Sequence, residues 1–155
     1  MGSILIVYYS RTGTTRLVAE KLAGLLEADL EEIAERKQRR GLLGFLSGCR
    51  DALLSRRSDL AAVPATQGRQ TLVVGTPVWA GGPTPAVRAY LGAADLEGKR
   101  VCAFCTFDGG EGKTLAKLAA LVPGGLVETL ALKKPAKDAD LDAKLADFAE
   151  RIRGA

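Results

Sequence analysis

The chain has 155 residues and a formal net charge of +4, and this length is typical of one domain, so we expect a single domain over residues 1–155. Apolar residues make up 47% and charged residues 26% of the composition, which excludes a disordered or fibrous chain and, with no apolar stretch of ~20 residues, a membrane-spanning one. The sequence contains no histidine, so we predict neither a metal site nor a catalytic triad.

Five short segments have the sequence patterns of β-strands. Continuous apolar runs such as ILIV and LVVG are typical of strands that are buried on both faces of a parallel sheet. Weaker, alternating patterns are typical of edge strands. The predicted buried strands are 4–7, 72–75 and 100–107, and the predicted edge strands lie within 29–35 and 126–132.

Helical patterns follow each of these strands. Apolar residues recur there every three or four positions, as on the buried face of an amphipathic helix. Thr84 followed by Pro85 is a typical helix start, with the threonine as the N-cap. The predicted helical segments are 16–26, 41–55, 85–91, 110–122 and 138–153.

The strict alternation of strands and helices predicts an α/β fold. We expect a three-layer, doubly wound, parallel five-stranded sheet with helices on both faces and the strand order 2-1-3-4-5. In this order the chain changes direction between strands 1 and 3, and ligands bind beyond the carboxyl ends of the strands at that point.

The loop SRTGTT follows the first strand and has the composition of a phosphate site. Four hydroxyl residues surround Gly13 where a helix is about to begin, and the unpaired amides of a helix N-terminus attract anions. A well-capped helix start is the simpler interpretation, but one cap needs one hydroxyl. A dinucleotide fingerprint is absent here, and GKT at 112–114 lacks the earlier glycine of an ATP-binding loop because Phe107 takes its place.

A second loop, 75–85, contains the only tryptophan of the chain, Trp79. Its position after the third strand places it across from SRTGTT, and we expect the indole to be exposed there and to stack on a planar ligand. The alternative is that the ring packs beneath the loop as part of the core. Gly81 and Gly82 would let the backbone come close to the ligand.

A third loop, 106–112, follows the fourth strand with the sequence TFDGGEG. Its glycines permit close approach of the backbone, and Phe107 could form a second wall of the site. A plain turn explains this loop equally well when it is considered alone.

Together, VYYSRTGTTRLVAEKLA, VVGTPVWAGGPTPAVRAYL and CAFCTFDGGEG resemble the three flavin-binding loops of the flavodoxin family, in the family's order and over essentially the whole chain. The resemblance implies a flavodoxin-like fold and non-covalent FMN. It implies that the phosphate is bound by Ser10, Arg11, Thr12, Gly13, Thr14 and Thr15. It implies that the ring system lies between Thr76, Pro77, Val78, Trp79, Ala80 and Gly81 on one side and Thr106, Phe107, Asp108, Gly109 and Gly110 on the other.

The resemblance also suggests the chemistry. We expect an electron-transfer protein that carries electrons between redox partners, with no catalytic side chain of its own, and with a carbonyl near Gly81 or Gly82 able to turn toward the reduced ring. The alternative is an FMN-dependent NAD(P)H:quinone-type oxidoreductase, whose relatives are usually longer. Typical flavodoxins are strongly acidic, whereas this chain is basic.

The positive charge is concentrated in residues 36–57, where seven cationic side chains face one carboxylate, Asp51. This segment is a candidate docking patch for an acidic redox partner, although a solvated outer helix face would have the same composition. We expect no nucleic-acid partner because aromatic residues are too few for base stacking. A monomer in the cytoplasm is the expected state, since the N-terminus has no basic leader or cleavage site.

Overall fold

The computed structural model describes residues 2–36, 46–50 and 59–155. The strands are β1 Ile4–Tyr8, β2 Asp29–Glu32, β3 Thr71–Trp79, β4 Gly82–Pro83, β5 Arg100–Phe107 and β6 Thr129–Lys133. The helices are α1 Thr14–Leu26, α3 Pro85–Ala93, α4 Thr114–Leu121 and α5 Leu141–Gly154, with a 3₁₀ turn, η1, at Pro135–Lys137. Residues 46–50 are also helical, and the rest of the helix predicted over 41–55 lies outside the described residues.

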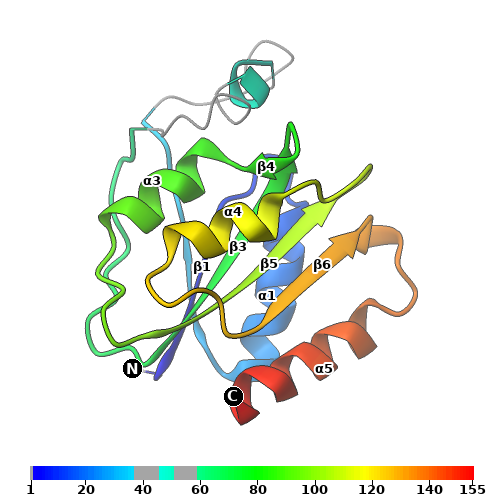
Figure 1. Ribbon diagram of the computed structural model, residues 1–155. Helices are drawn as coiled ribbons and strands as arrows, with labels where there is room; N and C mark the ends of the chain where they lie inside the picture. The colour runs from blue at the N-terminus through cyan, green and yellow to red at the C-terminus, as the bar shows by residue number, and fades with distance from the viewer. Residues whose placement is uncertain (1, 37–45, 51–58) are drawn as a thin grey trace.

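The main strands form a parallel sheet in the order β2-β1-β3-β5-β6. Because β4 is an extra two-residue strand, this order is the predicted 2-1-3-4-5, and the expected doubly wound fold is confirmed. Helices α1 and α5 cover one face of the sheet, and α3 and α4 cover the other (Figure 1).

The three central strands are buried on both faces, as their apolar runs predict. Successive side chains point to opposite faces, so Leu72 packs in the cluster under α3 and α4 while Val73 packs in the cluster under α1 and α5. Gly75 is required within β3, because a Cβ there would overlap the ring of Phe104 on the neighbouring strand. Cys102 is fully buried in the second cluster.

The local signals at helix ends are also confirmed. Thr84 is the N-cap of α3, where its Oγ1 accepts a hydrogen bond from the Val87 amide at 3.4 Å, and Pro85 is the first helical residue. Helix α5 has Asp142 in its first turn and two arginines in its last, which complements the helix dipole. None of the helices in the described part of the chain is long and apolar enough to cross a bilayer.

Strand β3 is longer than its sequence suggests. The prediction ended it at Gly75, whereas the strand continues to Trp79 and turns back through Ala80 and Gly81 to pair with β4. Both turn residues have positive φ, 50° and 72°, as in the two-residue turns that match the twist of a hairpin. Most of the predicted second loop is therefore a β-hairpin that extends the central strand.

Ala80 adopts a backbone conformation that asparagine tolerates better than alanine, so Ala80→Asn is expected to raise the free energy of unfolding by about 1 kcal/mol. Urea denaturation measures the change. Ala61→Asn is the control, since Ala61 is exposed and is not among the residues with positive φ. Equal effects of the two substitutions would contradict the strain argument.

Candidate functional site

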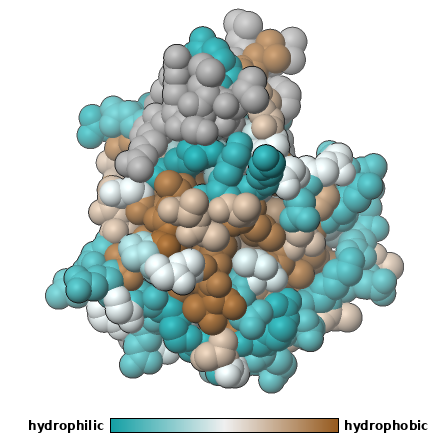
Figure 2. Space-filling view, viewed as in Figure 1, coloured by the Kyte–Doolittle hydropathy of each residue, from teal (hydrophilic) through white to brown (hydrophobic). Residues whose placement is uncertain are grey.

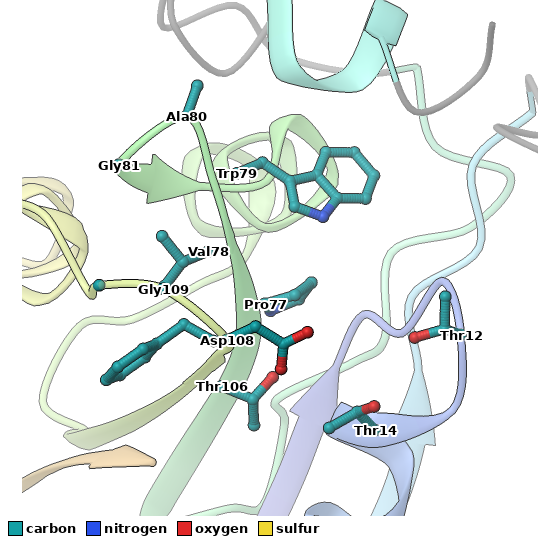
Figure 3. Close-up of a pocket in the computed structure, with 12 residues that line it drawn as sticks. Thr12, Thr14, Pro77, Val78, Trp79, Ala80, Gly81, Thr106, Asp108 and Gly109 are labelled. Atoms are coloured by element: carbon teal, nitrogen blue, oxygen red, sulfur yellow. The ribbon is translucent and has the colours of Figure 1, made fainter. Parts of the chain in front are cut away.

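The carboxyl ends of β1, β3 and β5 carry three loops that enclose a pocket of about 350 Å³ (Figure 3). This volume lies in the range of small-molecule sites. Every residue that lines it belongs to the predicted cofactor set. The lining residues are Thr12, Thr14, Pro77, Val78, Trp79, Ala80, Gly81, Thr106, Phe107, Asp108, Gly109 and Gly110.

The first loop forms the polar end of this pocket. Gly13 has a φ of 97° and is the N-cap of α1, and its carbonyl accepts the Leu17 amide at 3.0 Å. Thr12 and Thr14 line the pocket (Figure 3). No acidic residue lies in the first turn of α1, so the helix N-terminus keeps its partial positive charge.

Ser10 contributes to the first loop in a way the sequence did not predict. Its Oγ accepts hydrogen bonds from the amides of Gly13 at 3.1 Å and Arg16 at 3.3 Å, so the serine, which precedes the helix, caps one amide of its first turn. The Thr14 and Thr15 amides of the first turn have no acceptor among the described residues. These two amides are therefore available as donors to a ligand.

Thr15 and Thr76, whose hydroxyls were predicted to lie at the site, belong to the framework behind the pocket. Thr15 and Thr106 share a hydrogen bond of 2.9 Å between their buried hydroxyl oxygens, which joins the first loop to β5. The Thr76 hydroxyl donates to the Pro77 carbonyl at 2.8 Å and accepts the Thr84 amide at 3.2 Å. The predicted residues that do not line the pocket are Ser10, Arg11, Gly13, Thr15 and Thr76.

The expectation that the Trp79 ring is exposed is wrong. Because β3 runs on as a hairpin, the indole turns into the core beneath α3 and is only 4% exposed. The centroids of the Tyr9 and Trp79 rings lie 5.6 Å apart, and the two ring planes are nearly perpendicular. A Cβ on Gly48 would overlap the six-membered ring of the indole. The nitrogen edge of the indole still faces the hollow between Pro77 and Thr12 (Figure 3).

The second and third loops touch through their backbones. The Lys113 amide donates to the Gly81 carbonyl at 3.0 Å, and a Cβ on Gly112 would lie 2.6 Å from the Gly81 Cα and oxygen atoms. Any turning of the Gly81 carbonyl toward a ligand therefore breaks its bond to Lys113. The sequence marked these glycines as permissive but gave no sign that they meet.

Cys49 is a neighbour of the site that sequence reasoning missed. It is half-buried on the 46–50 helix. Burial raises the pKa of its thiol, while the Arg11 charge and the Ala80 backbone act in the opposite direction. The thiol therefore lies close to the hairpin turn. Cys49 lies within the predicted helix 41–55, and the helical pattern carried no signal for the pocket.

No protein-family model matches the chain, and no curated protein matches it. Solved structures do match it. A candidate flavoprotein of Bacteroides eggerthii has a TM-score of 0.76 at 20% identity over 97% of each chain. A flavoprotein of Lactobacillus acidophilus in complex with FMN has a TM-score of 0.67 at 20% identity, over 90% of this chain and 96% of that one. Oxidised flavodoxin 2 of Bacillus cereus has a TM-score of 0.57 at 19% identity over 99% of each chain.

These similarities define the class of architecture. At such low identities they establish the fold, and the fold is flavodoxin-like, as the three sequence motifs suggest. The function is a separate question that depends on the pocket.

Proposed function

We propose that the pocket binds FMN without a covalent bond and that the protein is an electron carrier. The observation that carries this proposal is the meeting of three loops at one pocket, with the start of α1 at its polar end and the β3–β4 hairpin along its side. Phosphate binding at a helix N-terminus and ring binding beside it are the two requirements of this cofactor.

The residues present fit both parts of FMN. The Thr12 and Thr14 hydroxyls and the Thr14 and Thr15 amides would bind the phosphate. The ring would lie between the hairpin, at Pro77 and Val78, and the third loop. Trp79 would contribute its nitrogen edge rather than a stacking face, because Gly48 packs against the ring.

FMN, when bound, supplies the redox chemistry. The protein would hold the phosphate, orient the ring and keep water from its buried side, and no described side chain is required as an acid or a base. The Lactobacillus acidophilus flavoprotein, whose structure contains FMN, supports this assignment by its similar fold.

The experiment is reconstitution of the purified protein with FMN. We expect tight, stoichiometric binding and a flavin visible spectrum that shifts on binding. The loaded protein should then show no steady oxidation of NADH or NADPH in the presence of a quinone. A protein that does not take up FMN would overturn the proposal, and rapid quinone-dependent oxidation would replace the carrier with the oxidoreductase.

Thr14→Val is expected to weaken FMN binding about tenfold, because one hydrogen bond to a charged phosphate is lost. Fluorescence titration measures the dissociation constant. Riboflavin, which lacks the phosphate, should bind the variant and the parent protein equally. Thr129→Val is the matched control, since Thr129 is exposed at the start of β6, outside the pocket. Equal losses for FMN and riboflavin would contradict the role of Thr14.

A further inference from the structure

Two lysines at the end of β6 lie directly beside one wall of the pocket. In the parallel pairing of β5 with β6, Lys133 is the partner of Phe107. The next residue, Lys134, donates its amide to the Phe107 carbonyl at 2.7 Å. Both lysine side chains are exposed, and Lys137 follows within η1. The surface on the β6 side of the third loop is therefore basic.

Two further lysines lie on the other side of the third loop. The Lys113 amide is bonded to the Gly81 carbonyl, which places this residue against the hairpin turn. The Lys117 Nζ lies 3.3 Å from the position that a Cβ on Gly82 would take, so its side chain extends over the hairpin. We call Lys113, Lys117, Lys133, Lys134 and Lys137 the lysine rim.

The lysine rim carries more positive charge than its described neighbours carry negative charge. Elsewhere, Lys21 pairs with Asp142 at 2.9 Å and Lys144 pairs with Asp138 at 2.6 Å. No rim lysine forms such an ion pair within the part of the chain that the structure describes. The third loop contains only two acidic residues, Asp108 and Glu111. The five lysines of the rim therefore outnumber them, and the charge around the third loop stays positive. Figure 2 shows a hydrophilic surface over the ends of β5 and β6.

We propose that the lysine rim is the docking surface for a redox protein with a carboxylate-rich face. The inference rests on the proposed function, because docking there would bring the partner to the edge of the bound ring. It also places the docking surface on residues other than the basic segment 36–57. Exposed charges of this kind mainly raise the rate of encounter, which suits a transient electron-transfer complex.

The distribution of the lysines favours a protein over a small anion. They lie on two separate segments, on either side of the third loop, and none of them lines the pocket. A small anion needs a concave site with converging donors. A broad partner surface can meet charges that are spread in this way.

The test uses the FMN-loaded protein and a reduced, acidic [2Fe–2S] ferredoxin as the probe. Two ferredoxin molecules each give up one electron, and FMN takes up the two electrons with protons from water. Stopped-flow absorbance gives the second-order rate constant at low and high salt. The rim variant is Lys133→Glu/Lys134→Glu, and the control is Lys21→Glu/Lys99→Glu, which changes the net charge equally on other parts of the surface.

At low salt the rim variant should react at least about tenfold more slowly than the parent protein, and the difference should largely disappear in ~0.5 M salt. The control should react within about twofold of the parent. An unchanged rim variant, or an equal loss in the control, would overturn the proposal. A rim variant that is slowed with NADPH but not with ferredoxin would also overturn it, because the rim would then bind a dinucleotide.

A second measurement does not depend on the flavin. A carbodiimide joins a lysine amine to a carboxylate with loss of water, so cross-linking to oxidised ferredoxin maps the lysines that face the partner. We expect cross-links at Lys133, Lys134 and Lys113. Cross-links confined to Lys99 or to the segment 36–57 would exclude the rim. If FMN does not bind, the carrier proposal fails, and the cross-links still decide whether the rim docks an acidic protein.

Discussion

Replacing Gly112 by alanine is expected to lower the free energy of unfolding by about 3 kcal/mol and to weaken FMN binding more than any single hydroxyl deletion. The new Cβ would lie 2.6 Å from the Gly81 backbone, and Gly112 has a φ of 57°. Overpacking against backbone atoms costs about 1–3 kcal/mol, and the left-handed conformation adds about 1–2 kcal/mol. The Gly81 Cα and oxygen are backbone atoms and cannot rotate away as a side chain could. The third loop must therefore move away from the hairpin.

Urea denaturation measures the stability, and titration with FMN measures the binding. Gly110→Ala is the matched control for stability, because it lies in the same loop, has no positive φ, and its Cβ would meet nothing within 4 Å. We expect the control to change stability by less than about 0.5 kcal/mol. Similar losses in both variants would show that the loop is sensitive to any side chain, and would contradict the proposed contact.

Thr15→Val is expected to lower the free energy of unfolding by about 2 kcal/mol. The substitution keeps the shape of the side chain but leaves the buried Thr106 hydroxyl without its partner at 2.9 Å. An unsatisfied buried polar group costs about 1–3 kcal/mol. FMN binding should weaken as well, since this bond fixes the first loop relative to β5.

The double variant Thr15→Val/Thr106→Val separates the bond from the packing. Removing both hydroxyls leaves no unsatisfied group, so we expect it to be more stable than Thr15→Val alone. A double-mutant cycle measured by urea denaturation gives the coupling between the two residues. Strictly additive losses would show that the hydroxyls act independently, and the link between the first loop and β5 would be rejected.

Much of the fold follows from local signals in the sequence. Buried strands such as Ile4–Tyr8 are continuous apolar runs, and Thr84 with Pro85 defines a helix start that depends only on adjacent residues. The strand order then follows from the alternation of elements and from the weaker patterns of the edge strands. The residues lining the pocket were predictable because loops at one edge of a parallel sheet converge.

The orientation of Trp79 could not be predicted in the same way. Its burial depends on Tyr9 and Gly48, which are 70 and 31 positions away in the chain. The composition of 75–85, rich in glycine and proline, suggested a solvated loop, whereas pairing of Val78 with Pro83 extends the strand. Tertiary contacts therefore override the local pattern at this point.

The contacts that shape the pocket were invisible for a related reason. A glycine that makes close backbone contact, such as Gly112, has the same sequence signature as a glycine in an open turn, such as Gly110. Likewise, four hydroxyls in SRTGTT suggested four similar roles, but Ser10 caps the helix and Thr15 bonds to Thr106. Only the three-dimensional arrangement separates ligand-facing hydroxyls from structural ones.

The pocket has two side walls that are held by different numbers of backbone contacts. One wall is the continuation of β3, which is held by the pairing of Val78 with Pro83 and of Trp79 with Gly82. The other is the exposed segment 108–111, anchored where Lys113 meets Gly81. Ligands that differ in thickness or in ring substituents would thus be accommodated by the segment 108–111. Efforts to re-engineer cofactor preference should therefore vary residues 108–111 and leave the hairpin intact.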